Sequence, residues 1–485
     1  MVVAQAIKPH VAVLSSPGMG HIIPLLELAK RLVIHHHFHV SFLVITTNEV
    51  SAAQDQLLRS ETLPLGIDVV RLSPVDVSAI TTDDMPVGTR LCVIVEESLS
   101  KFLKTVLIEL GKPIALVIDF FCTKAFDIGR ELSIPTYSFC TTSIAFLAFS
   151  LYLPTLDREV DCEFVDLPGT INIPGCSPLQ IQDLVDQVKN RKSDAYKRLL
   201  FFASRLPLSA GIFLNSWEDI EPITLKAVIE NPFFKGIPTP PVHPIGPVIK
   251  EEEQPTDDLG IECLAWLDKQ PPESVLFVAL GSGGTLSYEQ LTELAWGLEL
   301  SQQRFILVVR KPTNGSNSAA FFTVGSDNVN HLKAYLPEGF LDRTAERGLV
   351  VASWAPQMAV LKHPSTGGFL SHCGWNSALE SITCGVPMIA WPLYAEQKMN
   401  ATMLAEEVGV ATKPIINVEA ETCIVGREEI ERVVRVLMEG EEGKVMRRRA
   451  KDLKESAAKA LAIGGSSYDS LACVAKEWNA NPSMI

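Results

Sequence analysis

The amino-acid sequence predicts an α/β protein made of two Rossmann-like, doubly wound domains. Short apolar runs rich in β-branched residues alternate with segments of helical spacing, first over residues 10–215 and again from residue 275 onward. Between the two series, residues 231–258 contain seven prolines and close with the acidic run EEEQPTDD. That composition is typical of an exposed linker between domains.

The first series begins with the apolar run HVAVLSS at residues 10–16, which predicts a buried parallel strand. The glycine turn PGMGH follows and leads into an amphipathic helix over residues 22–34. Later segments predict strands at 40–46, 67–72, 115–119, 136–139 and 211–215, and helices at 91–110 and 122–132. Helices between successive strands indicate a parallel, doubly wound sheet.

The second series has the same pattern. It predicts strands at 275–280, 305–309, 349–353, 368–371 and 388–391, a helix from Tyr288, a loop at 311–330, a charged helical segment at 427–462 and a last helix at 466–478. We therefore expect an N-terminal domain over residues 1–248, a linker at 249–260, a C-terminal domain over 261–465, and a C-terminal helix at 466–485 that packs back on the first domain. Ligands of such sheets bind beyond the carboxyl ends of the strands, so two facing sheets would hold a ligand in a cleft between the domains.

Composition argues against several classes of protein. The net charge of −15 disfavours a nucleic-acid binder, which needs a basic surface. The ten cysteines are scattered without a C-x-x-C pair, which favours reduced thiols over a disulfide framework. The start of the chain lacks a basic, apolar leader, and the most apolar run, residues 144–153, is too short to cross a bilayer. These features predict a cytoplasmic protein without a transmembrane segment.

The segment 354–397 concentrates groups that suit a sugar nucleotide. Trp354 follows a predicted strand and offers a flat face for a base, and Gln357 can reach a ribose hydroxyl. A helix opens at Gly374, directly after another strand, so its first N–H groups form an anion site.

Further side chains of this segment complete the site. His372, Asn376 and Ser377 add donors for phosphate, Glu380 can accept from ribose hydroxyls, and Glu396 and Gln397 begin the next helix, where they suit the hydroxyls of a hexose. The alternative is a pair of ordinary β/α units with normal helix caps. Any single residue favours that alternative, whereas the whole set in this order favours a sugar-nucleotide site.

The segment resembles the signature of the plant family 1 UDP-dependent glycosyltransferases. The opening WAPQ, the central HCGWNS, the Glu that follows and the closing Gln stand where that family has them, and PGMGHIIP near the start is similar too. The resemblance implies the GT-B fold, with two Rossmann-like domains, a cleft between them and a UDP-sugar held mainly by the second. It also implies a role in plant secondary metabolism. Gln397 and Trp375 are typical of members that use glucose.

The resemblance also implies roles for single residues. It assigns Trp354 to uracil stacking, Gln357 and Glu380 to the ribose, His372, Asn376, Ser377 and Ser282 to the phosphates, and Glu396 and Gln397 to glucose, with Ala355, Gly374 and Trp375 in the same donor site. A glycine-flanked serine such as Ser282 at a strand end is also a reasonable anion site on its own chemistry.

His21 and Asp119 are the candidate catalytic pair. His21 follows the first strand and Asp119 ends another, and a His oriented by a buried Asp is a suitable general base. The alternative is two residues that cap helices. The resemblance places a catalytic dyad here and implies that His21 deprotonates a phenol, which displaces UDP with inversion to give a β-glucoside. No D-x-D motif occurs, so neither a metal nor another cofactor is expected.

Apolar residues of the sequence are candidates for an acceptor pocket. Apolar candidates are Ile94, Phe120, Phe121, Phe146 and Leu147, with Gly284 leaving room for a flat polyphenol, and simple core packing is the alternative for each. Within the family the chain resembles the phenol and hydroquinone glucosyltransferase group and also flavone 8-C-glucosyltransferases. This implies a flavonoid or polyphenol acceptor and C-glucosides as well as O-glucosides.

The sequence is also compatible with other functions. The alternatives are an O-glucosyltransferase of simple phenols or hydroquinone, and a nucleotide-sugar-binding protein without turnover. A dehydrogenase is weaker, because PGMGH lacks the G-x-G-x-x-G spacing. The expected ligands are UDP-glucose and a phenolic small molecule, and the expected state is a monomer.

Overall fold

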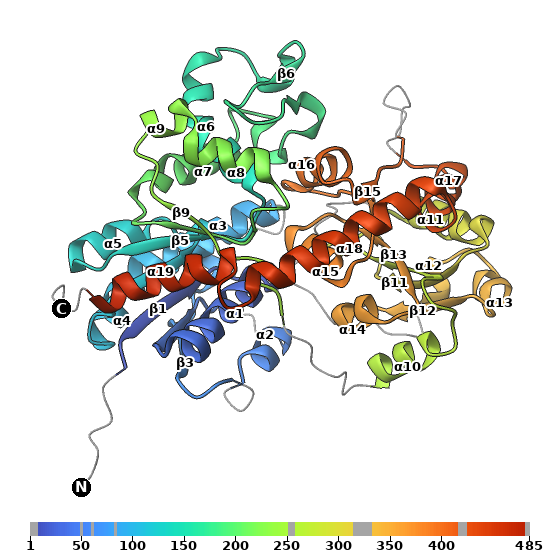
Figure 1. The fold of residues 1–485 in the computed structure, drawn as a ribbon, viewed down its shortest axis with the longest axis horizontal. Coiled ribbons are helices and arrows are strands. Elements are labelled where there is room, and N and C mark those ends of the chain that lie inside the picture. The colour runs from blue at the N-terminus through green and yellow to red at the C-terminus, as the bar shows by residue number, and fades with distance from the viewer. Residues whose placement is uncertain are drawn as a thin grey trace, which may run out of the picture. The chain divides into compact units, whose positions relative to one another are not determined.

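The computed structural model describes residues 8–48, 52–59, 63–81, 85–250, 258–313, 332–415 and 424–480 (Figure 1). The chain divides into two compact units. Unit 1 comprises Met1–Gln182, Gln187–Lys250 and Lys459–Ile485, and unit 2 comprises Asp183–Asp186 and Glu251–Ala458.

Unit 1 is built on a parallel sheet whose seven strands have the order β3-β2-β1-β4-β5-β8-β9. The strands are β1 (His10–Ser15), β2 (His39–Val44), β3 (Ile67–Arg71), β4 (Ala115–Asp119), β5 (Thr136–Cys140), β8 (Ile212–Leu214) and β9 (Val242–Pro244). Its helices are α1 (Met19–His36), α2 (Ala52–Leu57), α3 (Val87–Ser98), α4 (Lys104–Glu109), α5 (Ala125–Leu132), α6 (Ile144–Glu159), α7 (Asp194–Arg205), α8 (Pro222–Glu230), α9 (Pro232–Gly236) and α19 (Ser466–Ala480).

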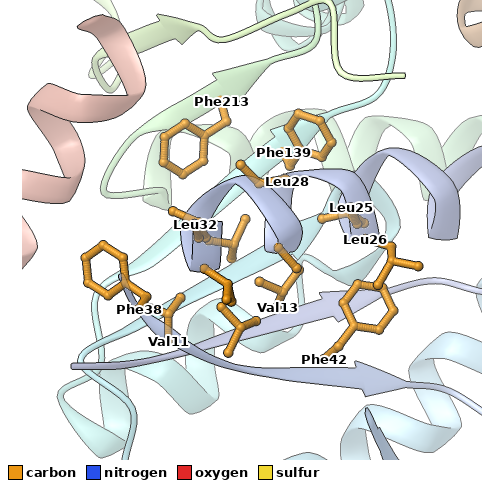
Figure 2. Close-up of a cluster of buried hydrophobic side chains, with 14 of the residues drawn as sticks. Val11, Val13, Leu25, Leu26, Leu28, Leu32, Phe38, Phe42, Phe139 and Phe213 are labelled. Carbon is orange, nitrogen blue, oxygen red and sulfur yellow. The ribbon is translucent and has the colours of Figure 1, made fainter. Parts of the chain in front are cut away.

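Both faces of this sheet are buried. Along β1, Val11 and Val13 belong to one apolar cluster, whereas Ala12 and Leu14 belong to another on the opposite face. Figure 2 shows the first cluster, in which the leucines of α1 lie against the valines of β1. Successive side chains of a strand point to opposite faces, so a strand covered on both sides is apolar throughout. This explains why the sequence shows β1 as an unbroken apolar run.

Unit 2 contains a second parallel sheet with six strands in the order β12-β11-β10-β13-β14-β15. The strands are β10 (Val275–Ala279), β11 (Arg304–Val309), β12 (Gly348–Ala352), β13 (Thr366–Ser371), β14 (Met388–Ala390) and β15 (Ala411–Thr412). Its helices are α10 (Asp258–Leu267), α11 (Tyr288–Ser301), α12 (Leu332–Tyr335), α13 (Phe340–Thr344), α14 (Gln357–Lys362), α15 (Trp375–Cys384), α16 (Gln397–Thr402), α17 (Arg427–Met438) and α18 (Glu441–Leu461).

Several expected boundaries differ from the structure. The helix expected at 91–110 consists of α3, the π-helical turn Leu99–Leu103 and α4. The helical segment expected at 427–462 divides into α17 and α18 around Gly440, where a Cβ atom would lie 2.6 Å from the Val436 carbonyl oxygen.

The domain boundaries also differ. Unit 2 ends at Ala458, seven residues before the expected boundary at 465, and α18 continues through that point without a break that the sequence could reveal. Of the expected linker, residues 251–257 lie outside the described part of the chain, and α10 already begins at Asp258. Most of the loop expected at 311–330 also lies outside it.

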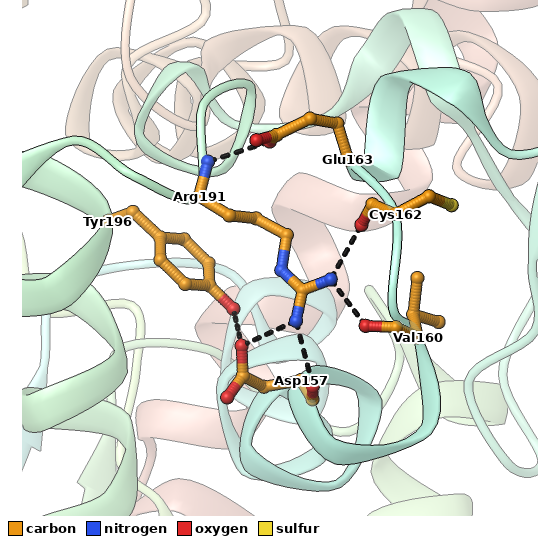
Figure 3. A network of polar contacts seen from close by, with 6 residues as sticks. All are labelled: Asp157, Val160, Cys162, Glu163, Arg191 and Tyr196. Atoms are coloured by element: carbon orange, nitrogen blue, oxygen red, sulfur yellow. Dashed lines mark hydrogen bonds and ion pairs between the residues drawn. The ribbon is translucent and has the colours of Figure 1, made fainter.

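A long excursion of unit 1 between α6 and α7 is held by the guanidinium group of Arg191 (Figure 3). It donates to the carbonyl oxygens of Asp157, Val160 and Cys162 and to the Asp157 carboxylate at 2.9 Å. Tyr196 on α7 donates to the same carboxylate. One side chain thereby fixes the end of α6 and the start of α7. The excursion includes the short hairpin of β6 (Thr170–Ile171) and β7 (Leu179–Gln180).

Candidate functional site

Unit 1 brings His21 and Asp119 together at the carboxyl ends of neighbouring strands. His21 lies in the first turn of α1, directly after β1, and Asp119 is the last residue of β4, which pairs with β1. The chain can turn into α1 this sharply because Gly18 adopts a φ of 108°. His21 Nδ1 lies 3.0 Å from Asp119 Oδ1, and the side chains are 20% and 0% exposed. Thr141, just after β5, places its hydroxyl 3.4 Å from the same nitrogen.

Burial and hydrogen bonding determine the protonation states of His21 and Asp119. Complete burial raises the pKa of Asp119, but the charge of His21 and its hydrogen bond to the carboxylate outweigh burial, so the pKa lies below its usual value. The carboxylate is therefore ionised and can only accept a hydrogen bond. His21 Nδ1 consequently carries the ring proton, and Nε2 is the basic nitrogen. This is the arrangement of a general base.

A cluster of aromatic rings adjoins His21 through Phe121. Phe121 meets the His21 ring edge-on at 5.2 Å, and Phe120 contacts Phe121 and Phe146. Phe202 from α7 joins the same cluster through contacts with Phe120 and Phe121. The sequence did not indicate Phe202, because it lies on an amphipathic helix far along the chain with no motif beside it.

Two of the expected acceptor-pocket residues have other surroundings. Ile94 is 2% exposed and belongs to the apolar core cluster that also contains Leu14. Gly284 lies in unit 2, and a Cβ atom there would stand 2.2 Å from the Leu280 carbonyl oxygen. Its missing side chain therefore serves backbone packing. A role of these two residues in an acceptor pocket stays a prediction.

In unit 2, the turn between β13 and α15 carries His372. Gly374 is the N-cap residue of α15, and as a glycine it has no side chain that could bind the N–H groups of the first turn. The His372 ring occupies the space that side chains at Gly281 and Gly374 would need, since a Cβ atom on either would come within 2.3 and 2.5 Å of it. Burial and then the charge of Arg310 lower the pKa of His372 to about 4, so the imidazole is neutral at pH 7. Its Nδ1 has no hydrogen-bond partner in the described part of the chain.

Three of the expected ribose and phosphate residues form one cluster. Gln357, at the start of α14, donates from its amide to Glu380 Oε2 at 2.6 Å and to Ser377 Oγ at 2.9 Å. Asn376 stands beside Ser377 in the first turn of α15. Ser282 is in the turn that follows β10, next to Gly281 with its φ of 71°.

The aromatic candidates differ in exposure. Trp354, after β12, is 45% exposed and presents a face to solvent, whereas the neighbouring Ala355 is buried. Trp375 is only 2% exposed, so its indole is buried, and its place in the donor site stays a prediction.

Glu396 and Gln397 stand at the start of α16, after β14. Glu396 is the N-cap residue of this helix. The side-chain carbonyl of Gln397 accepts from the backbone N–H groups of Leu393 and Tyr394 at 2.9 and 3.0 Å. The loop that precedes α16 is thereby fixed by the same residue that is expected to contact the sugar.

Arg310 is a neighbour of this site that the sequence did not indicate. It follows β11, and its guanidinium donates to the Ser353 carbonyl oxygen at 3.0 Å and to the Gly284 carbonyl oxygen at 3.2 Å. These bonds join the turn after β10 to the turn before Trp354. Its position directly after a predicted strand is the feature of the sequence that could have indicated it.

The described residues contain neither a metal-binding cluster nor a membrane-spanning helix. No group of three or more His, Cys, Asp or Glu side chains within them is arranged to hold a metal ion. Within the same residues, no helix combines the length and apolarity needed to cross a membrane.

Comparison with known proteins gives concordant results. Residues 226–447 match the family described as UDP-glucoronosyl and UDP-glucosyl transferase. The chain is 48% identical over 476 residues to hydroquinone glucosyltransferase of Rauvolfia serpentina, covering 97% of this chain and 98% of that protein. It is 45% identical over 471 residues to anthocyanidin 3-O-glucosyltransferase 5 of Manihot esculenta, covering 97% and 96%.

Solved structures are similar over the whole chain. The crystal structure of TcCGT1 in complex with UDP aligns with a TM-score of 0.90 and 48% identity, covering 98% of this chain and all of that one (100%). The structure of Phytolacca americana UGT2 with UDP-2fluoro-glucose and pterostilbene aligns with a TM-score of 0.86 and 42% identity, covering 98% and 100%.

Proposed function

This chain belongs to the plant family 1 UDP-dependent glycosyltransferases with the GT-B fold, and from this premise we propose that it transfers glucose from UDP-glucose to a phenolic acceptor. In this proposal unit 2 binds the donor and unit 1 binds and activates the acceptor. The observation that carries the catalytic part is the hydrogen bond between His21 and the buried, ionised Asp119.

The proposed reaction is a single displacement. His21 Nε2 takes the proton of a phenol hydroxyl, while Asp119 stabilises the imidazolium that forms. The phenolate oxygen forms a bond to the anomeric carbon, and the bond from that carbon to the UDP oxygen breaks with its electron pair on UDP. Attack from the face opposite the leaving group converts an α-linked donor into a β-glucoside.

The donor assignments draw on the geometry of unit 2. The exposed face of Trp354 suits a uracil ring, and the Gln357–Glu380 pair suits the ribose hydroxyls. The first turn of α15 and the neutral His372 supply hydrogen-bond donors for the diphosphate. We propose that these groups and Arg310 stabilise the leaving UDP without a metal ion.

The proposed acceptors are flavonoids and simpler polyphenols. The relatives named above act on hydroquinone and on an anthocyanidin, both phenols. The rings of Phe120, Phe121, Phe146 and Phe202 give an aromatic environment next to His21. A phloroglucinol-type phenolate shares its charge with the ortho carbon, so that carbon can bond to the anomeric carbon while the bond to the UDP oxygen breaks with its electron pair on UDP. Loss of the hydrogen on that ring carbon to solvent as a proton then restores the aromatic ring, so the same base also serves formation of a C–C bond. We propose that such flavones give C-glucosides, including at position 8, and hydroquinone-type phenols give O-glucosides.

One experiment tests the proposal. The protein is incubated with UDP-glucose and either hydroquinone or a phloroglucinol-type flavone, UDP release is measured, and the products are fragmented by mass spectrometry. O-glucosides lose the intact hexose, whereas C-glucosides break across the sugar ring. Binding of UDP-glucose without UDP release in any acceptor mixture would instead identify a nucleotide-sugar-binding protein.

A further inference from the structure

Four consecutive residues, Asp183–Asp186, leave the body of unit 1 and belong to unit 2. The chain before and after them, up to Gln182 and from Gln187, belongs to unit 1. Leu184 and Val185 are fully buried. The segment is therefore tightly packed and is not a loosely attached loop.

The two aspartates of this segment bind the two ends of α16. Asp183 accepts a hydrogen bond from the Thr402 hydroxyl at 2.8 Å, at the last residue of the helix. Asp186 accepts from the backbone N–H of Ala395 at 3.0 Å, two residues before the helix begins. The segment thus holds α16 at both ends.

The bond from Ala395 fixes an unusual backbone conformation. Ala395 has a φ of 56°, which is unfavourable for a residue with a Cβ atom and persists only when its surroundings stabilise it. The two preceding amides, of Leu393 and Tyr394, are both bound by the Gln397 side chain. Three successive N–H groups are therefore held by two side-chain acceptors, and the residue that follows them is Glu396.

We propose that Asp186 is a positioning residue for the sugar end of the donor. It acts through Ala395, whose left-handed conformation sets the direction of Glu396 and the start of α16, and Asp183 anchors the other end of that helix. The inference rests on the proposed function, because Glu396 and Gln397 are the residues proposed to contact glucose. The residues proposed to bind the base, ribose and diphosphate lie in other loops, so Asp186 should govern recognition of the hexose and not of UDP.

The test compares Asp186→Ala, Asp186→Asn and Gln182→Ala, the last a matched control at an exposed residue just before the segment. Loss of one hydrogen bond to a charged group corresponds to roughly a tenfold effect. We expect kcat/KM for UDP-glucose to fall about tenfold in Asp186→Ala, and UDP-galactose to be discriminated less strongly. The Kd of UDP, measured by calorimetry, should stay within about twofold of the wild type. Asp186→Asn keeps an acceptor oxygen and should retain most of the activity.

A second variant separates positioning from a general loss of structure. Glycine adopts positive φ without strain, so Ala395→Gly in the Asp186→Ala background should recover part of the lost kcat/KM. Unchanged kinetics in Asp186→Ala, or an equal loss of UDP affinity, would overturn the inference while leaving the proposed function intact. A wild-type protein that binds UDP-glucose but releases no UDP with any phenol would overturn the proposed function itself.

Discussion

Burial and the neighbouring His21 have opposite effects on the pKa of Asp119. Burial alone raises the pKa of this carboxyl group, whereas the charge of His21 and its hydrogen bond bring the pKa below its usual value. The result is a carboxylate that is shielded from water and that directs its partner's proton to Nδ1. His372 in unit 2 shows the opposite outcome, because burial and the nearby positive charge of Arg310 both disfavour its protonated form.

Replacement of His21 by alanine removes the proposed base. We expect the rate of UDP release in the presence of acceptor to fall about 10²- to 10⁴-fold, as is usual for loss of a general base. The Kd of UDP should be unchanged, since the residues proposed to bind the donor lie in unit 2. His243→Gln, in β9, is a matched control that should keep full activity. A His21→Ala protein with near wild-type turnover would exclude the proposed mechanism.

The low pKa of His372 predicts how stability depends on pH. The folded-state pKa of about 4 lies below the ordinary 6.5, so as the pH falls the unfolded chain takes up this proton before the folded chain does. The free energy of unfolding should therefore decline between pH 6.5 and 4, by up to about 3 kcal/mol from this group. Urea titrations of the wild type and His372→Gln across this range check the prediction. The variant cannot take up the proton, so parallel curves for the two proteins would contradict it.

At the residue scale, the sequence indicates side chains that stand directly at a strand end or within the signature segment. His21 and Asp119 were found in this way, and the structure joins them by a hydrogen bond. Phe202 and Asp186 could not be found, because each makes its contacts from a distant part of the chain with no motif. Arg310 does stand at a strand end, directly after β11, but no motif surrounds it. Asp186 is 209 residues from the amide that it binds.

The elements of the two sheets differ in how strongly the sequence marks them. β1, β4 and β10 are covered on both faces, so they read as continuous apolar runs and were expected within one residue of their bounds. The edge strands β9 and β15 were not expected. β9 has three residues, ends on Pro244 and lies in the proline-rich stretch, and β15 has two residues. Strands this short carry no measurable periodicity.

The hydrogen bonds of Arg191 predict how much this residue stabilises the segment between α6 and α7. Arg191→Ala would leave the carbonyl oxygens of Asp157, Val160 and Cys162 without this donor, and the side chain is only 17% exposed. We expect a loss of about 3 kcal/mol in the free energy of unfolding. The exposed pair of Arg130 and Asp127 is the matched control, and Arg130→Ala should cost less than about 0.5 kcal/mol. Equal urea midpoints for the two variants would show that the Arg191 network contributes little.

At the scale of the molecule, unit 1 is assembled from separate stretches of chain. Helix α19, at the C-terminal end, packs on β9 and α1 of this unit. Trp478 of this helix contacts the rings of Phe38, Tyr137 and Phe213. The hydroxyl of Ser467 at the other end of the helix donates to the Gly246 carbonyl oxygen at 2.6 Å. The last helix is therefore an integral part of the N-terminal core.

Trp478→Ala should reveal this dependence. The indole is 5% exposed, and its removal leaves a cavity among three aromatic rings, so we expect a loss of about 3–5 kcal/mol in the free energy of unfolding. Trp478→Phe keeps most of the ring contacts and should lose less. Tyr288→Ala, at a 49% exposed aromatic residue, is the control. A Trp478→Ala protein as stable as this control would show that α19 is dispensable.

The placement of α19 has a consequence for the order of synthesis. A polypeptide emerges from the ribosome beginning with its N-terminus, yet the hydrophobic interior around Phe38 and Phe213 lacks Trp478 until unit 2 has been translated. The core of unit 1 is therefore incomplete, and part of its apolar surface stays exposed, while unit 2 is being synthesised. Chaperone binding during that interval should be strongest on the aromatic surface that α19 eventually covers.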